Sequence, residues 1–433
     1  MSPTEISLLG IGLLLVLLVS SMPVGLAMAL AGVAGFALMT SPEAAMNMAS
    51  AEFFGTFGKY DLSTIPLFIL MGQVAFHTGI SKGLFNAAYH WVGHWRGGLA
   101  MSSVAACAAF GAICGSGPAT AATMAAVALP EMRRYKYNME LATGCIAAGG
   151  SLGMMIPPSI VFIVYAVLTQ QSIGQLFIAG VAPGIMTAIL FCLAIYWVCR
   201  RRPEMGPAGE ISTWRERLAS LKDIFETLLI FVAVMGSMFA GYCTATEAAA
   251  IGAAATLIVG YFKKRLSWAT LKQCLWETLR TSCMVILIVA GALIFGRFLA
   301  VTHTPAALAQ WIGGLALPPW GIMAAILLFY LVAGCFVDAL ALNLLTIPIF
   351  YPVVTALGYD LVWFGVVIVL VTQMGVITPP VGVNAYVVSG MARDVPLPLI
   401  FKGAIPFLVC LVIVAAVLIA LPKTVLFLPS LLQ

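Results

Sequence analysis

Two segments of this sequence could bind a small cation, because each combines a helix break with an oxygen-bearing side chain. The first reads Cys114-Gly115-Ser116-Gly117-Pro118, and the second reads Gly334-Cys335-Phe336-Val337-Asp338. The polar residues Ser116 and Asp338 lie 222 positions apart. A cation in a dry site needs oxygen ligands in place of its hydration shell, and unwound backbone adds carbonyl oxygens to these side chains.

Two Pro-Pro pairs repeat with the same spacing. Pro157-Pro158 follows Gly153-Met154-Met155-Ile156, and Pro379-Pro380 follows Gly375-Val376-Ile377-Thr378. Proline removes a helix hydrogen bond and clashes with the preceding turn, so each apolar stretch must break there. Irregular backbone at membrane depth is tolerated only inside protein or along a cavity. Broken helices at matching positions of two halves are typical of secondary transporters, with the site at the breaks.

These features predict two cation sites and an anion path between them. The first site combines Ser116 with Gly153, Ile156 and Pro158, and the second combines Gly334 or Asp338 with Gly375, Thr378 and Pro380. The residues expected along the substrate path are Cys114, Gly115, Gly117, Pro118, Asn343, Pro157, Pro379 and Asn384. Half-helices restarting at Pro158 and Pro380 would point positive dipole ends inward, which suits a carboxylate.

Structural readings of the same residues stay open. The Gly-Ser-Gly-Pro segment could be a plain bend, and Asp338 could lie in water at the end of a span. Asn343 and Asn384 could line the path or bridge helices, whereas Thr120 is expected to bond back to its own helix. Glu247 is expected to cap the start of a helix.

Composition identifies a polytopic membrane protein. The 433 residues are 62% hydrophobic and 9% charged, against roughly 25% charged in soluble domains. Spans of about 20 apolar residues leave room for roughly ten to fourteen membrane segments. Residues 6–21 are expected to be a retained span rather than a cleaved signal. The net charge of +5 lies mostly in short loops, where it reports orientation rather than nucleic-acid binding.

No set of residues favours an enzyme or a cofactor site. The ten cysteines are scattered without CxxC spacing, and the tip segment is not a GxSxG nucleophile elbow. His90 and His94 stand four residues apart but have no third ligand nearby. With Trp91 and Trp95 beside them, they are expected to anchor the chain at the membrane interface.

Charge predicts that the two halves have opposite orientations. Arg133, Arg134 and Lys136 follow Pro130, whereas the loop after Pro352 carries only Asp360. Residues 169–175 carry no charge, whereas Arg393 and Lys402 follow the second break. Under the positive-inside rule the basic loops are cytoplasmic, and residues 41–60, 169–175, 301–318 and 353–361 are external.

The predicted fold is an all-α polytopic membrane protein with inverted repeats, two re-entrant helical hairpins and two broken helices. The hairpins span 98–132 and 319–353, and short surface helices precede them at 83–97 and 305–314. The two inverted halves are expected at 98–199 and 319–421. Further spans are expected in 1–97 and in 200–318, which starts with a basic linker, and a tail follows at 422–433.

Four motifs together resemble the large membrane subunit, or DctM component, of TRAP transporters. They are Cys114-Gly-Ser-Gly-Pro-Ala-Thr120, Thr246-Glu-Ala-Ala-Ala-Ile-Gly252, Met154-Met-Ile-Pro-Pro158 and Gly375-Val-Ile-Thr-Pro-Pro380. The resemblance spans essentially the whole chain. The family more often has Ser where this chain has Cys114, so Ser116 and carbonyl groups would have to bind the ion here.

The resemblance implies a sodium-coupled importer in a bacterial or archaeal inner membrane, with Na⁺ as the coupling ion and no cofactor. It implies two partners: a small four-helix membrane subunit, and a periplasmic binding protein that delivers an organic-acid anion. It also implies an elevator movement, in which 98–199 and 319–421 would be transport halves that slide against a scaffold formed by the spans and surface helices of 1–97 and 200–318. The substrates typical of the family are C4-dicarboxylates, keto acids, sialic acid and sugar acids.

Three alternatives remain at this point. A stand-alone carboxylate or ion transporter of similar architecture would need no binding protein. A membrane-embedded enzyme would need a convergent nucleophile or metal set. A channel would need a continuous pore, which fits broken helices in inverted halves less well than alternating access does.

Overall fold

The computed structural model describes residues 2–314 and 318–431, and every regular element in this part of the chain is helical. Six helices are long and apolar enough to cross a bilayer: Met139–Thr169, Ile173–Arg201, Ala245–Phe262, Trp268–Val301, Ala339–Ala356 and Leu397–Ala420. Six more apolar helices are shorter: Pro3–Val19, Val24–Met39, Gly98–Cys114, Ile224–Phe239, Pro319–Gly334 and Leu361–Gly375. In the described residues these six long and six shorter apolar helices make twelve, within the roughly ten to fourteen membrane segments predicted from composition.

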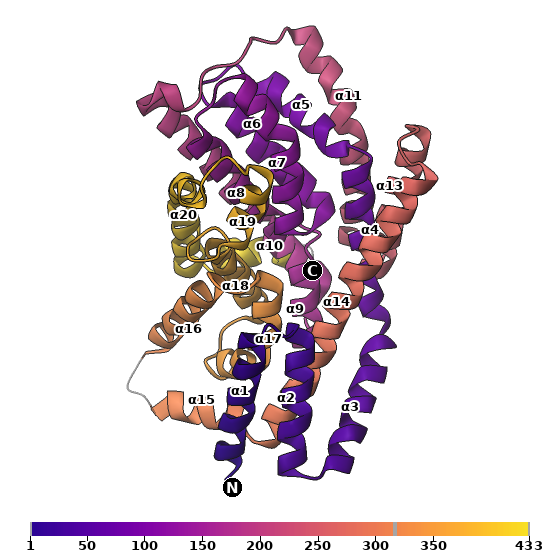
Figure 1. Ribbon diagram of the computed structural model, residues 1–433, viewed down its shortest axis with the longest axis vertical. Helices are drawn as coiled ribbons and strands as arrows, with labels where there is room; N and C mark the ends of the chain where they lie inside the picture. Colours follow the sequence, from indigo (N-terminus) through magenta and orange to yellow (C-terminus); the bar gives the residue numbers. More distant parts are fainter. Residues whose placement is uncertain (1, 315–317, 432–433) are drawn as a thin grey trace.

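The segments predicted to be the scaffold, residues 1–97 and 200–318, contain the N-terminal and central helices. They are α1 (Pro3–Val19), α2 (Val24–Met39), α3 (Pro42–Phe57), η1 (Tyr60–Ser63), α4 (Thr64–His77), α5 (Ile80–Val92), η2 (Pro203–Met205), α11 (Trp214–Phe231), η3 (Val232–Gly236), α12 (Ser237–Phe239), α13 (Ala245–Phe262), α14 (Trp268–Val301) and α15 (Thr304–Gly314). Helix α14 runs through the centre and packs on α2 and α4 (Figure 1). The α2 contact is close, because a Cβ on Gly291 would collide with the carbonyl of Gly25.

The two predicted transport halves contain matching series of elements. The first half has α6 (Gly98–Cys114), α7 (Gly117–Arg134), α8 (Met139–Met155), α9 (Ile160–Thr169) and α10 (Ile173–Arg201). The second half has α16 (Pro319–Gly334), α17 (Ala339–Ala356), α18 (Leu361–Gly375), α19 (Val383–Met391) and α20 (Leu397–Ala420), and α21 (Lys423–Leu431) follows it. Each half therefore contains a hairpin, a broken helix and a long final helix, as predicted.

Two long-range contacts show that the halves are inverted. Arg133, at the end of the first hairpin, pairs with Asp394, which follows the second broken helix. Tyr165, near the end of the first broken helix, donates its hydroxyl to the carbonyl of Leu361, at 2.6 Å, where the second broken helix begins. The start of one broken helix therefore lies with the end of the other. Figure 1 also shows α5 and α15, which precede the two hairpins, near opposite ends of the long axis.

The halves interlock closely. Helix α8 packs against α20, and a Cβ on Gly403 would collide with the carbonyl of Glu140. Helix α19 packs against both α7 and α8. Lys402 also pairs with Glu140 at 3.2 Å. The two halves thus form one continuous packed body.

One helix was not predicted, and one local prediction was wrong. Residues 42–57, within a segment expected to be external, form α3, because Ser41 caps it by accepting from the Ala44 N–H and Ala45 and Ala49 are buried. The half-helices were expected to restart at Pro158 and Pro380, but α9 starts at Ile160 and α19 at Val383. Ser159 caps α9, and Gly382, with a φ of 56°, turns the chain into α19.

The predicted ends of other elements shift by a few residues. The hairpins extend to Arg134 and Ala356, and the surface helices begin at Ile80 and Thr304. The C-terminal tail contains α21, and its last two residues lie outside the described part of the chain. Glu247 forms a capping box with Thr244, so its expected capping role is confirmed.

Candidate functional site

The two hairpin tips meet at one cavity of about 240 Å³. Its lining includes Gly115 to Pro118 from the first tip and Asp338 and Leu340 from the second. Thr281 and Val285 of α14 form the scaffold wall. The polar residues that lie 222 positions apart in sequence therefore face the same space.

Gly115 sets the backbone conformation of the first tip, and the Ser116 side chain there makes no capping hydrogen bond. Gly115 ends α6 with a φ of 65°, a conformation that favours glycine because it lacks a Cβ. Its carbonyl accepts from the Ile160 N–H at 3.2 Å, which joins the tip to the start of α9. Ser116 then starts α7 in extended backbone, and its side chain makes no capping hydrogen bond. The Ser116 hydroxyl is thus available to a ligand in the cavity.

The first helix break lies directly behind this tip. A Cβ on Gly153 would lie 2.6 Å from the Thr120 hydroxyl and 2.9 Å from the Ser116 carbonyl oxygen. The Pro158 carbonyl similarly lies beside Gly115, 2.6 Å from where a Cβ would stand. Three predicted ligands of the first cation site, Ser116, Gly153 and Pro158, are therefore brought together.

The other residues of the first break have structural roles. Ile156 is extended, and its side chain packs against Gly184 of α10. Pro157 and Pro158 are buried. The Ser159 hydroxyl donates to the Met154 carbonyl at 2.6 Å, which satisfies an acceptor freed by the break. Thr120 bonds back to the Ser116 carbonyl at 2.8 Å, as predicted for its own-helix role.

The second break binds its tip through backbone groups. Gly334 and Gly375 are in such close contact that a Cβ on Gly375 would collide with the Gly334 carbonyl. The Cys335 carbonyl accepts from the N–H groups of Val381 and Gly382, at 3.1 and 3.3 Å. Thr378 donates its hydroxyl to the Met374 carbonyl at 2.6 Å. Gly334, Gly375 and the break are therefore one unit.

Asp338 belongs to the cavity between the tips. Its carboxylate caps α17 by accepting from the Leu340 N–H at 3.0 Å, and the residue lines the tip cavity with Ser116. Pro379 and Pro380 are exposed, unlike Pro157 and Pro158. The second Pro-Pro pair thus lies in a more open environment than the first.

A second cavity, of about 360 Å³, continues from the first. Cys114, Ser116 and Pro118 line it on the hairpin side, so these path residues lie together. Gln73 of α4, with Glu277 and Thr281 of α14, lines the scaffold side. Both cavities share Ser116, Pro118, Ile160 and Thr281. They are neighbouring cavities between the first hairpin and helices of the predicted scaffold.

Three buried amides surround the second break, and sequence reasoning missed one of them. Asn343 on α17 donates to the Ala339 carbonyl, whereas Asn384 on α19 donates to the Ala147 carbonyl of α8, at 3.1 Å. Within the described residues, the Oδ1 atoms of both and the whole amide of Gln373 lack a hydrogen-bond partner. Gln373, fully buried on α18, could have been found as the one amide in an apolar helix.

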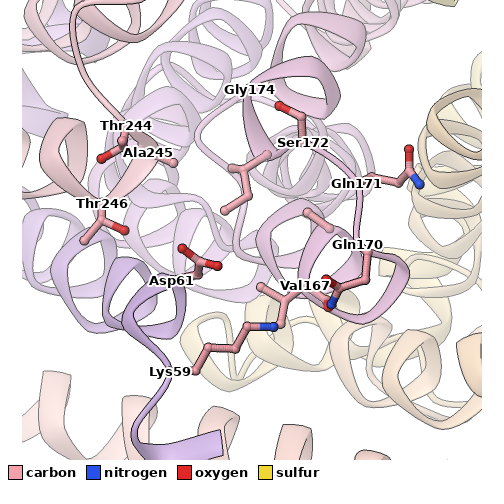
Figure 2. A pocket seen from close by; sticks show the side chains of 12 residues that line it. Lys59, Asp61, Val167, Gln170, Gln171, Ser172, Gly174, Thr244, Ala245 and Thr246 are labelled. Carbon is pink, nitrogen blue, oxygen red and sulfur yellow. The ribbon is translucent and has the colours of Figure 1, made fainter.

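A separate polar pocket of about 280 Å³ lies at the turn between α9 and α10. Figure 2 shows Lys59 and Asp61 at its lower left, Thr244 to Thr246 above them, and Gln170 to Gly174 opposite. The scaffold and the first half meet at this pocket. In residues 2–314 and 318–431, no three His, Cys, Asp or Glu side chains could hold a transition metal together.

The all-helical architecture and the paired hairpins define the class of this protein, a multi-pass membrane transport protein. The fold is shared with a solved structure described as the Alcanivorax borkumensis YdaH transporter, with a TM-score of 0.59 and 13% identity over 86% of this chain and 87% of that one. That likeness concerns the fold alone.

Sequence relatives give the family. The family model "Tripartite ATP-independent periplasmic transporter, DctM component" matches residues 11–424. The chain is 35% identical to the C4-dicarboxylate TRAP transporter large permease protein of Pseudomonas aeruginosa, covering 91% of both chains. It is 34% identical to the sialic acid large permease of Vibrio cholerae (96% of both) and 30% identical to the ectoine large permease of Halomonas elongata (96% and 97%). The chain belongs to the DctM family of TRAP transporter large permeases, which are membrane transporters and not enzymes.

Proposed function

We propose that this large permease is a sodium-coupled importer of an organic-acid anion, which it receives from a periplasmic binding protein. The observation that carries the proposal is the meeting of two hairpin tips, each joined by backbone hydrogen bonds to its own broken helix. Two such units supply carbonyl oxygens and a carboxylate inside apolar surroundings. Oxygen ligands of this kind suit a hard monovalent cation.

Sodium coupling is supported by the oxygen atoms at the two breaks. Ser116 and Asp338 supply side-chain oxygens at the tips, and the Pro158 carbonyl lies beside the first tip. Near the second break, the side-chain oxygens of Asn343, Gln373 and Asn384 have no donor among the described residues. Buried polar atoms without partners are costly, so a bound ion or water there would recover lost hydrogen-bond energy.

An anionic substrate is supported by the field in the tip cavity. Helix α7 begins at Gly117 with its first N–H groups at this cavity, and no side chain caps them. The positive end of a helix favours an anion by roughly 0.3–1 kcal/mol. The named substrates of the relatives, C4-dicarboxylate and sialic acid, agree with a carboxylate.

Elevator movement is supported by the packing. The two halves interlock through α8 and α20, whereas the first hairpin meets α4 and α14 of the predicted scaffold partly across cavities and partly through a close contact between Gly72 and Cys114. A body held together internally and bordered by cavities along this contact could slide as a unit. The same arrangement would place the cavity alternately at each membrane face.

Two partners belong to the proposal, a small four-helix membrane subunit and a periplasmic binding protein. The tripartite description of the family supports both. The rival is a stand-alone carboxylate transporter of the same fold. Co-purification from native membranes distinguishes the two, because only the first proposal requires a small membrane protein to remain bound.

Sodium-dependent thermal unfolding of the purified full chain tests the ion. A ligand that binds only the folded state raises its stability in proportion to the logarithm of concentration. Sodium chloride should raise the unfolding midpoint above that in choline chloride at equal ionic strength. No difference between the two salts would contradict sodium binding. In vesicles, uptake driven by a proton gradient alone would instead support proton coupling.

A further inference from the structure

A cavity of about 670 Å³ lies at the basic end of the molecule, away from the hairpin tips. Its lining includes His94, Trp95 and Arg96 from the turn after α5, and Leu193 and Arg200 from α10. The cavity therefore joins the predicted scaffold to the first transport half. No residue of the two predicted cation sites takes part in it.

The turn at Gly97 places Arg96 and Arg200 beside the same cavity. Gly97 has a φ of 75°, and its N–H donates to the Gly206 carbonyl at 2.9 Å. A Cβ on Gly97 would lie 2.8 Å from Cys199 and from Ile195, so the turn sits directly on α10. This close contact keeps Arg96 beside the last turn of α10, where Arg200 lies.

The positive charges of this cavity are uncompensated. Within residues 2–314 and 318–431, neither Arg96 nor Arg200 forms an ion pair, unlike Arg133, Lys263 and Arg297. The buried Nδ1 of His94 also lacks a hydrogen-bond partner in this part of the chain. Guanidinium groups and an imidazole together suit a phosphate, which accepts several hydrogen bonds at once.

An apolar stripe leads from the cavity along α10. Ile185, Ile189, Leu193 and Tyr196 follow one another at helical spacing, and between 42% and 55% of each side chain is exposed. Eleven residues of helix rise about 16 Å, close to the depth of one leaflet of the roughly 30 Å hydrocarbon core. Trp95, half exposed at the rim, is of the type enriched at the headgroup level.

We propose that this cavity is a binding site for an anionic phospholipid. The phosphate would contact Arg96, Arg200 and His94, and one acyl chain would follow the apolar stripe on α10. A basic pocket with an apolar extension fits a lipid better than it fits a free phosphate, because a free phosphate leaves the stripe unused. Its place at the basic end assigns it to the cytoplasmic leaflet.

Lipid binding to the full chain tests the site by native mass spectrometry. The probes are phosphatidylglycerol, phosphatidylcholine with the same acyl chains, and glycerol phosphate. Phosphatidylglycerol should bind at least about tenfold more tightly than phosphatidylcholine, because each arginine near the surface contributes attraction to an anionic lipid. Arg96→Gln with Arg200→Gln should remove this preference, and the paired lysine variants should keep most of it.

The matched control is Arg215→Gln with Lys222→Gln, which changes the same charge on exposed residues of α11. This control should leave the preference for phosphatidylglycerol intact. An equal loss in both double variants would overturn the proposal, since it would indicate diffuse attraction. Displacement of the lipid by glycerol phosphate at the same concentration would also overturn it. Unchanged thermal unfolding in the variants shows that they are folded.

Discussion

The two helix breaks use the same backbone device in different surroundings. At the first break, the proline pair is buried and Ser159 satisfies the freed carbonyl of Met154. At the second break, Thr378 likewise satisfies the carbonyl of Met374, but Pro379 and Pro380 are exposed. Three amides on the surrounding helices retain unpaired atoms within the described residues. Around the first break, the buried polar atoms are thus more completely hydrogen-bonded. Around the second break, more of them remain free to bind a ligand.

This difference has a physical consequence. A satisfied buried network adds rigidity, whereas unpaired buried polar atoms cost stability until a ligand binds them. The second half should therefore depend more strongly on bound ion than the first. Substitutions at matching positions of the two halves can test this asymmetry directly.

The largest effect is expected from Gly375→Ala. The added methyl group would collide with the Gly334 backbone, which cannot rotate away as a side chain can. We expect loss of most uptake and a destabilisation of about 1–3 kcal/mol, measured by thermal unfolding. At the first break, Gly153→Ala should cost less, because only the Thr120 hydroxyl lies as close as 2.6 Å and the nearest backbone atom, the Ser116 carbonyl oxygen, lies 2.9 Å away.

Gly390→Ala is the matched control in the same half. Gly390 lies in the last turn of α19, and no heavy atom lies within 4 Å of a Cβ built there. This variant should keep its uptake and gain a little stability, because alanine favours helix. Equal damage from the two substitutions would show that the close contact at Gly375 is not what matters.

Ion binding should distinguish the two tips. Asp338→Asn removes a charged oxygen. It should raise the sodium concentration that gives half of the maximal stabilisation by roughly 10- to 100-fold, as expected for a charged hydrogen-bonding group. Ser116→Ala removes a neutral hydroxyl and should raise the same sodium concentration by about tenfold or less. Both variants should still insert into the membrane. Wild-type sodium dependence and uptake in either variant would remove that residue from the ion sites.

Opposite signs of stability change are expected at Gln373 and its positional mate Ser151. Gln373→Leu removes an unpaired buried amide, so in sodium-free buffer it should stabilise the protein by about 1 kcal/mol. Ser151→Ala removes a hydroxyl that donates to the Ala148 carbonyl at 2.7 Å, and should destabilise it by a similar amount. Thermal unfolding without sodium measures both. Destabilisation by both substitutions would end the claimed asymmetry between the breaks.

The smallest effect is expected from the ion pair that links the halves. The hydrogen bond from Arg133 holds the pKa of Asp394 below its usual value. A depressed folded pKa adds stability above the unfolded pKa, near 4, and that stability is lost as pH falls through the folded value. Asp394→Asn should therefore flatten the pH dependence of thermal unfolding slightly below about pH 4. An unchanged profile there would show that this exposed pair contributes nothing measurable.

Sequence predicted the features that depend on backbone chemistry. Pro157-Pro158, Pro379-Pro380 and the Gly-rich tip at Ser116 dictate breaks wherever they occur, and loop charge indicated the inversion confirmed by the Arg133–Asp394 pair. Environment was harder to predict. The helix α3 was not predicted, and it buries only Ala45, Ala49 and Thr56. Neither the exposure of Pro380 nor the unpaired amide of Gln373 follows from local sequence, because both depend on which helices surround them.

The most direct test of the central claim is the number of sodium ions bound per chain. Equilibrium binding of radioactive sodium to the purified full chain should approach two ions. The double variant Ser116→Ala with Gly153→Ala should retain one ion, bound at the second break. Thr378→Ala with Gln373→Leu should likewise retain one, bound at the first. A wild-type protein that binds one ion or none, or loss of both ions in either variant, would contradict two independent sites built from inverted halves.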